Sequence, residues 1–129
     1  MQSIKLLISG ICGGAIAAIA VVGRQLAIDP YDYFGFPGIK GINALKPFMY
    51  ENARLAKPIV IAREKPSAIV FGGSTSESAY DPDSPYFKPY GRAYNAALPG
   101  GRFYESYRML QHATAVSDLK LAVVALDFL

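Results

Sequence analysis

The fold is decided by a short apolar run that ends in a glycine turn: Ser67-Ala-Ile-Val-Phe71, followed by Gly72-Gly-Ser-Thr-Ser76. The continuous apolar stretch, rich in β-favouring residues, predicts a buried strand. The two glycines predict a sharp turn that presents the Ser74 hydroxyl at the carboxyl end of this strand. A serine nucleophile also needs a base and donors for the oxyanion, and the same Gly-Ser pattern is typical of a helix N-cap or a turn.

Two more strands and a helix are predicted after this turn. Arg92-Ala-Tyr-Asn95 reads as a second short strand, and the apolar stretch from Leu119 to Leu126 as a third, buried one. A helix is predicted from residue 103 to about residue 114, where four residues recur at helical spacing: Phe103, Tyr107, Leu110 and Thr114. Within it, Glu105 is spaced to pair with Arg108. Strands alternating with helical segments predict an α/β layer with parallel strands.

The N-terminal residues 1–24 predict a membrane segment. Leu6 to Gly23 is an uncharged run of 18 residues, flanked by Lys5 and Arg24. An uncleaved single-span anchor is one interpretation, since the run is longer than a usual signal-peptide core. The other is a secretory signal with Ala18-Ile19-Ala20 as its cleavage site. The positive charge of Lys5 favours an inside N-terminus and a periplasmic or extracellular position for residues 25–129.

Charge and cysteine content exclude several classes of protein. The chain has 13 basic and 10 acidic residues, a net charge of +3, and the part after Arg24 has 11 against 10. This balance gives little support for nucleic-acid binding, which needs a concentrated basic face. Cys12 is the only cysteine, so the chain holds neither a disulfide framework nor a cysteine-cluster metal site. Asp81 and Asp83 read as a solvated turn, and no metal or cofactor is expected.

Residues 25–65 are rich in proline, glycine and aromatic residues, typical of a juxtamembrane region. Helical spacing between Ala44 and Arg63 is expected to be broken by Pro47 and Pro58. The aromatic side chains of this region either lie at the membrane interface or pack onto the following domain. They are Tyr31, Tyr33, Phe34 and Phe36.

Two motifs resemble the SGNH (GDSL-type) hydrolase superfamily, in particular its membrane-anchored members in polysaccharide modification. Ile69-Val-Phe-Gly-Gly-Ser-Thr-Ser-Glu77 is similar to the first block of the family, in which a strand ends in Gly-Asp-Ser. Gly73 stands here in the place of that Asp. Tyr94-Asn-Ala-Ala-Leu-Pro-Gly100 resembles the second block, and the resemblance covers residues 66–129.

The resemblance implies roles for particular residues. Ser74 would be the nucleophile, and the backbone N–H groups of Ser74 and Gly100 would bind the oxyanion. Gly72 and Gly73 would support the turn, and Asn95 would shape the second loop. The third block of the family places an Asn where this chain has Ala125-Leu-Asp127. That donor is unassigned, and Asp127 is either structural or a ligand of a substrate hydroxyl.

The resemblance also implies a three-layer α/β/α, flavodoxin-like domain with five parallel strands in the order 2-1-3-4-5. Residues 66–129 supply the first three strands, so we expect an incomplete domain, truncated before the Asp-x-x-His motif of the family. His112, the only histidine, is expected on the surface of the predicted helix. The third strand would form an exposed apolar edge, and we expect residues 25–129 alone to be poorly soluble or molten.

Three functions are compatible with these features. In the first, the chain is the N-terminal portion of an enzyme that acts on acyl or acetyl esters of cell-envelope polysaccharide and that a downstream Asp-x-x-His motif completes. Alternatively, it is a non-catalytic envelope protein for binding or assembly, or a truncated gene product without activity of its own. Aromatic residues that could line a carbohydrate cleft, or simply pack in the core and loops, are Tyr86, Phe87, Tyr90, Tyr94, Phe103, Tyr104 and Tyr107.

Overall fold

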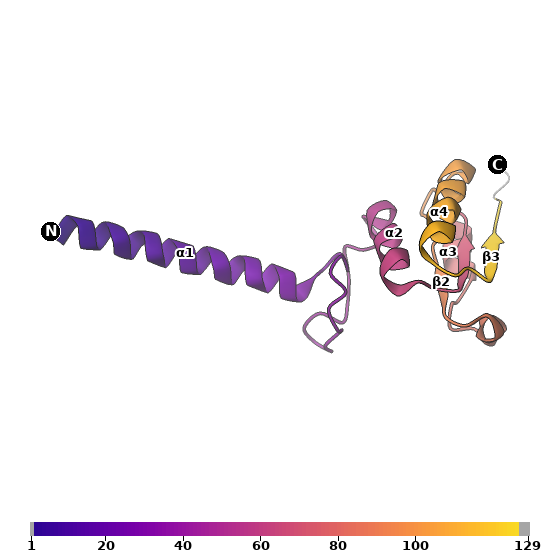
Figure 1. Ribbon diagram of the computed structural model, residues 1–129, viewed down its shortest axis with the longest axis horizontal. Coiled ribbons are helices and arrows are strands. Elements are labelled where there is room, and N and C mark those ends of the chain that lie inside the picture. Colours follow the sequence, from indigo (N-terminus) through magenta and orange to yellow (C-terminus); the bar gives the residue numbers. More distant parts are fainter. Residues whose placement is uncertain (1, 127–129) are drawn as a thin grey trace. The chain divides into compact units, whose positions relative to one another are not determined.

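The computed structural model describes the backbone of residues 2–126 and, apart from residues 2, 3 and 5–7, their side chains. Its elements, in chain order (Figure 1), are α1 (Gln2–Ile28), α2 (Ala53–Glu64), β1 (Ala68–Phe71), α3 (Ser74–Ala79), the 3-10 helix η1 (Pro85–Tyr90), β2 (Ala93–Asn95), α4 (Phe103–Val116) and β3 (Leu121–Val124). The chain divides into two compact units, of which the first ends at Phe48 and the second begins at Met49. Helix α2 therefore belongs to the unit that contains the sheet.

Helix α1 is long and apolar enough to cross a membrane. Its stretch Ile8–Ile28 has 21 residues and a mean hydropathy of 1.8, and none of this window is buried within the protein. The expected apolar N-terminal helix is thus present, and it continues past Arg24 to Ile28. A signal sequence near the N-terminus can meet the same criteria of length and hydropathy, so the helix is compatible with both interpretations of the N-terminus.

The three strands form one sheet in the order β2-β1-β3. They are parallel, as the alternating pattern predicts. Strand β1 lies in the centre, where Ile69 is aligned with Tyr94 of β2 and with Ala122 of β3. All four residues of β1 are buried, in agreement with its continuous apolar sequence. The chain is therefore a mixed α/β protein with a small parallel sheet.

Both faces of β1 are covered, because successive side chains of a strand point to opposite faces. Ile69 and Phe71 belong to the larger core cluster, which also contains residues of α2 and α4: Ala53, Ile61, Met109 and Ala113. Ala68 and Val70 form a second cluster with Phe87 of η1. The core thus holds the carboxyl end of β1, where the glycine turn begins, between helical segments on both faces.

Strand β3 is shorter and more exposed than the sequence predicts. It spans Leu121–Val124, and its residues alternate between half-buried and exposed. Leu121 and Val123 pack against the cluster around Phe87. Ala122 and Val124 share the face of Ile69 and Phe71 but are exposed, because the core cluster with α2 and α4 does not reach this edge of the sheet.

The expectation that Pro58 breaks the second helical segment is wrong. Helix α2 runs from Ala53 to Glu64 with Pro58 inside it. A proline in a helix removes one backbone hydrogen bond, but this helix is held by packing. Its buried apolar residues, which recur every three to four positions, are Ala53, Ala56, Val60 and Ile61. Tertiary burial therefore outweighs the local cost of the proline.

Helix α4 covers the predicted residues but buries another face. Ser106, Met109 and Ala113 are its buried residues, whereas Phe103 and Tyr107 are 65% and 47% exposed. Small side chains at positions 106 and 113 let the helix approach the sheet closely, which the larger aromatic rings would prevent. Phe103 and Tyr107 therefore lie on the outer face, whereas Leu110 is half-buried and packs against the core cluster.

Candidate functional site

The turn between β1 and α3 holds Ser74 at the first position of the helix. Gly73 is the N-cap residue, and Ser74 and Thr75 are exposed. A Cβ on Gly72 would lie 2.4 Å from the Oγ of Ser76 and 2.8 Å from its Cβ, and Ser76 is buried. Only glycine fits at this position, so the turn folds tightly and leaves the Ser74 side chain on the outside.

The loop after β2 lies directly against this turn. The N–H of Leu98 donates to the carbonyl oxygen of Gly72 at 2.9 Å, which continues the pairing of β1 and β2 beyond the strands. A Cβ on Gly101 would lie 2.9 Å from the carbonyl oxygen of Leu98 and 3.1 Å from that of Gly72. Gly100, next to it, has a φ of +60°, in the left-handed region that favours glycine. The loop therefore needs two consecutive glycines for different reasons.

These two loops and the end of β3 enclose a hollow of about 770 Å³ at the carboxyl edge of the sheet. Ser74 and Gly100 both line it, as do Gly72 and Gly73. The remaining lining residues are Thr75, Gly101, Arg102, Phe103, Ser106, Ala125 and Leu126. Clefts at this edge, outside the carboxyl ends of parallel strands, are where open α/β sheets bind ligands.

The hollow offers a hydroxyl, backbone donors and one cation. Within the described residues, neither the N–H of Ser74 nor that of Gly100 has a hydrogen-bond partner, so both can donate to a ligand. Arg102 is the only charged residue in the described lining. The arrangement can therefore bind an oxygen that carries negative charge, but the described lining contributes no group that could accept a proton from Ser74.

Asn95 ties the two loops together from outside the hollow. Its side-chain amide donates to the carbonyl oxygens of Ser76, Glu77 and Tyr80, at 3.2, 3.2 and 2.8 Å. Its Oδ1 accepts the N–H of Ala97 at 3.1 Å. One side chain thus satisfies the last carbonyls of α3 and starts the loop after β2, which fixes where α3 ends relative to β2.

Arg54 and Lys57 of α2, which were not predicted as site residues, contact the same part of the chain. Arg54 donates from Nη2 to the carbonyl oxygens of Pro99 and Gly100 at 3.3 and 3.5 Å. It also forms a bidentate ion pair with Glu105, with Nε at 2.6 Å from Oε1 and Nη2 at 3.3 Å from Oε2. The sequence feature that could have indicated this contact with the loops is the spacing of Arg54 and Lys57. They lie three residues apart on α2, beside two buried alanines.

Glu105 connects Arg54 to the start of α4. Its Oε2 accepts the backbone N–H of Arg102, the N-cap residue, at 2.9 Å. The hydrogen bond from Arg54, and after it the one from Arg102, hold the pKa of Glu105 below its usual value of 4.5. The expected pairing of Glu105 with Arg108 is wrong, since Arg108 instead donates to Gln111 at 2.9 Å. A fixed fork-to-fork contact outcompetes a flexible pair along one helix.

Lys57 is the second brace and is almost completely buried, with 5% of its surface exposed. Its Nζ lies 2.7 Å from Oε1 of Glu77 in α3 and donates to the carbonyl oxygen of Ala97. The buried ammonium therefore links α2 to both the helix that begins with Ser74 and the loop that carries Gly100. Burying a charge is costly unless it is paired, and here one partner belongs to α3 and the other to the loop after β2.

The other candidate residues lie apart from this hollow. His112 is half-buried on α4, with Nε2 at 3.0 Å from the carbonyl oxygen of Pro58, and it lines a second hollow together with Arg54. Asp81 accepts the N–H of Asp83 at 2.9 Å, as in a turn. No group of three potential metal ligands occurs among the described residues. Asp127 lies outside the described residues.

The aromatic residues proposed for a carbohydrate cleft are mostly elsewhere. Phe103 is the one that lines the hollow of Ser74, whereas Phe87 belongs to the core. Tyr86 is 86% exposed on η1, and Tyr104 lines the second hollow with His112. The seven aromatics are therefore distributed over several surfaces and the core, so they do not form one cleft.

Comparisons with known proteins do not add to this geometry. A scan against protein-family models, a search of curated proteins and a search of solved structures found no match.

Proposed function

We propose that the chain is the N-terminal portion of a membrane-anchored, SGNH-hydrolase-like protein that acts on acyl or acetyl esters of cell-envelope polysaccharide. The observation that supports this most is the hollow at the carboxyl edge of the sheet, because Ser74 and Gly100 line it together. Its sheet order, β2-β1-β3, is that of the first three strands in a three-layer, flavodoxin-like domain. The proposal extends this partial sheet to that complete fold.

In this proposal the Ser74 Oγ attacks the carbonyl carbon of the ester. A base from outside the described residues accepts the hydroxyl proton, and the carbonyl oxygen becomes negatively charged. The backbone N–H groups of Ser74 and Gly100 then donate to this oxygen, and each such donor typically contributes about 10²–10³-fold to the rate. The C–O bond of the ester breaks, the sugar hydroxyl leaves with a proton, and water or an acceptor hydroxyl later releases the acyl group from Ser74.

The location follows from α1, which we propose to be a single-pass anchor rather than a cleaved signal. Its apolar stretch Ile8–Ile28 corresponds to about 32 Å of helix at ~1.5 Å per residue, close to the ~30 Å hydrocarbon core of a bilayer. With Lys5 on the inner side, the sheet unit would face the periplasm or the cell exterior, where envelope polysaccharides are found.

Labelling with a fluorophosphonate probe tests the proposed nucleophile. The protein is expressed from its natural reading frame in membranes and compared with Ser74→Ala and Thr75→Ala. Thr75 is the matched control, because it is the next hydroxyl in the same lining and is exposed as well. We expect labelling of the parent protein and of Thr75→Ala but not of Ser74→Ala. Labelling that persists in Ser74→Ala would contradict the assignment.

A non-catalytic binding module is the second candidate. It is favoured by the described lining, which contains Arg102 but no histidine, aspartate or glutamate. Such a module would retain acetylated polysaccharide through Arg102 and the free backbone donors. We expect its binding to fall on Arg102→Ala and to be unaffected by Ser74→Ala, together with no fluorophosphonate labelling of the parent protein.

A further inference from the structure

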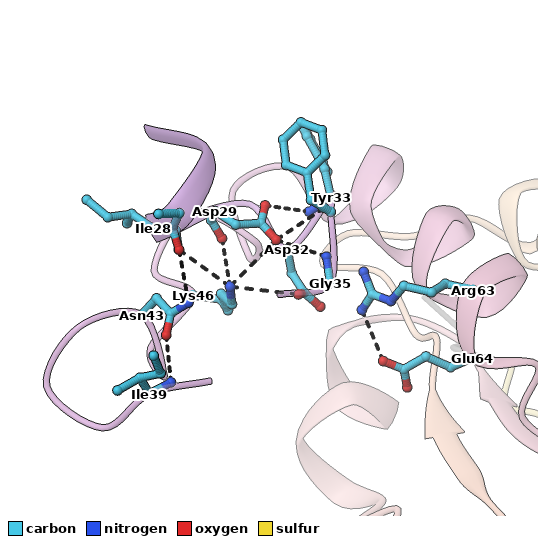
Figure 2. Close-up of polar contacts among 12 residues, drawn as sticks. Ile28, Asp29, Asp32, Tyr33, Gly35, Ile39, Asn43, Lys46, Arg63 and Glu64 are labelled. Atoms are coloured by element: carbon cyan, nitrogen blue, oxygen red, sulfur yellow. Dashed lines mark hydrogen bonds and ion pairs between the residues drawn. The ribbon is translucent and has the colours of Figure 1, made fainter. Parts of the chain in front are cut away.

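The loop formed by residues 29–48 closes the C-terminal end of α1. The last carbonyl groups of a helix have no partner within it. Here the Asn43 side chain donates from Nδ2 to the carbonyl oxygen of Ala27 at 3.0 Å. The Lys46 ammonium donates to the carbonyl oxygens of Ile28 and Asp29 at 3.5 and 3.0 Å, as Figure 2 shows. The end of the helix is therefore satisfied by the protein itself instead of by water.

The charged side chains of Asp29 and Lys46 are turned inward as well. Asp29 is 2% exposed, and its carboxylate accepts the backbone N–H groups of Tyr33, Phe34 and Gly35 at 2.9, 3.1 and 3.0 Å (Figure 2). Lys46 Nζ lies 3.6 Å from Oδ2 of Asp29. This carboxylate is thus neutralised and saturated with donors, as a charge must be if it is to lie in surroundings of low polarity.

Apolar side chains cover the outside of the same loop. Leu45 is 85% exposed, and the other exposed apolar residues are Phe34, Phe36, Ile39, Ile42 and Phe48, each at least 43% exposed. A further hollow of about 480 Å³ lies between the last turns of α1 and the loop, lined by residues that include Val22, Leu26 and Tyr31. Polar groups inside and apolar groups outside are the reverse of a loop in water.

The position of the loop in the chain indicates what covers this surface. The stretch Ile8–Ile28 is apolar and none of it is buried within the protein. A helix of this length ends at the edge of the hydrocarbon core. Residues 29–48 begin at that edge, so their exposed apolar side chains continue the apolar surface of α1 into the headgroup layer. Aromatic side chains are enriched at this depth, and Tyr31 stacks on Tyr33 with ring centroids 5.2 Å apart.

We propose that residues 29–48 form an interfacial platform, which inserts its exposed apolar side chains into the headgroup layer of the bilayer that α1 crosses. Its occupant is phospholipid, with acyl chains against Leu26 and Phe34 and headgroups near the exposed Lys40. This inference rests on the anchor in the proposed function but not on Ser74. The platform holds the polypeptide at the bilayer surface before the second unit begins at Met49.

The absence of tryptophan from the chain provides a direct test, because a single introduced tryptophan then reports alone. Leu45→Trp probes the platform and Ile16→Trp probes the middle of α1. Tyr86→Trp is the matched control, since Tyr86 is 86% exposed and Leu45 is 85% exposed. The full chain is reconstituted in phosphatidylcholine–phosphatidylglycerol vesicles with bromine either near the headgroups or near the acyl-chain ends, and tryptophan fluorescence is recorded.

We expect shallow bromine to quench Leu45→Trp at least about twofold more than Tyr86→Trp, with a blue-shifted emission. Ile16→Trp should be quenched most by the deep bromine. If Ile16→Trp behaves so but Leu45→Trp resembles Tyr86→Trp, the anchor stands and the platform is wrong. A blue-shifted Leu45→Trp that no bromolipid quenches would mean that a protein surface covers the loop, and would likewise overturn the proposal. Loss of Ser74 labelling would leave all these outcomes unchanged.

Discussion

Replacing Lys57 by methionine tests whether helix α2 holds the two loops of the candidate site. Methionine has nearly the length of the lysine stem, so Lys57→Met removes the ammonium with little change in packing. The ammonium lies within hydrogen-bond distance of Glu77, at 2.7 Å, and of the carbonyl oxygen of Ala97. After the substitution, the carbonyl oxygen of Ala97 has lost its donor, and water does not replace it because Ala97 has no exposed surface. The Glu77 carboxylate has lost its cation.

The size of the effect follows from burial. Breaking a buried ion pair by removing one partner costs about 3–5 kcal/mol. Lys57 has a side-chain exposure of 7%, but that of Glu77 is 20%, so water recovers part of the loss. We therefore expect about 3 kcal/mol, near the lower limit of that range. At ~1.4 kcal/mol per tenfold change, this free energy corresponds to a population of the opened state that is roughly 150 times larger.

Amide hydrogen exchange of β1 in the intact, micelle-bound protein measures this population. All of β1 is buried, so we expect its amides to exchange only when the sheet unit opens. Lys88→Met is the matched control at an exposed lysine and should change β1 exchange by less than about 0.5 kcal/mol. The double variant Lys57→Met/Glu77→Gln should recover part of the loss, since no unpaired carboxylate remains. A less than about tenfold effect of Lys57→Met on β1 exchange would refute the bracing role.

Three further predictions concern the loops of the site. Because the pKa of Glu105 is lowered, its contribution to the free energy of unfolding is complete above the usual value of 4.5 and is lost as the pH falls below it. The protection of β1 from hydrogen exchange should therefore decrease less in Glu105→Gln than in the parent protein between about pH 5 and pH 3. Asn95→Asp should destabilise the sheet unit more than Asn95→Ala, because a carboxylate would face three carbonyl oxygens that now accept hydrogen bonds; equal urea midpoints would count against this network. Gly101→Ala should lower the free energy of unfolding in urea by about 2–3 kcal/mol, since its Cβ would meet backbone oxygens. A Cβ on Gly100 has open space, so Gly100→Ala should cost only about 1 kcal/mol, for its positive φ. The reverse order of the two costs would be incompatible with the loop geometry.

The local sequence predicts an element where burial or a glycine turn determines the structure within a few residues. The apolar run before Gly72 predicts the central strand β1, because burial on both faces requires continuous hydrophobicity. Its glycine turn and the glycines after β2 predict the two loops, and the hollow places Ser74 and Gly100 in one lining. The expected roles of these residues in catalysis remain predictions.

The remaining features depend on contacts between distant residues. Arg54 binds Glu105, which lies 51 positions away. Glu105 therefore pairs with Arg54 instead of the nearby Arg108 because of how α2 and α4 pack. Pro58 is tolerated inside a helix for the same reason, since burial against the sheet is not visible in a local pattern. Lys46 closes the end of α1 from 17–18 positions away, through a loop whose fold no periodicity describes.

The central claim is that the Ser74 hydroxyl is the reactive group of the hollow, and mapping the fluorophosphonate adduct tests it most directly. The membrane-bound protein from the natural reading frame is treated with the probe and digested with trypsin. Because prolines follow Lys65 and Lys88, the relevant peptide runs from Glu64 to Arg92. Fragmentation of this peptide should place one adduct on Ser74. An adduct on another residue of the peptide, or an unmodified peptide under conditions that label a known serine esterase, would contradict the account.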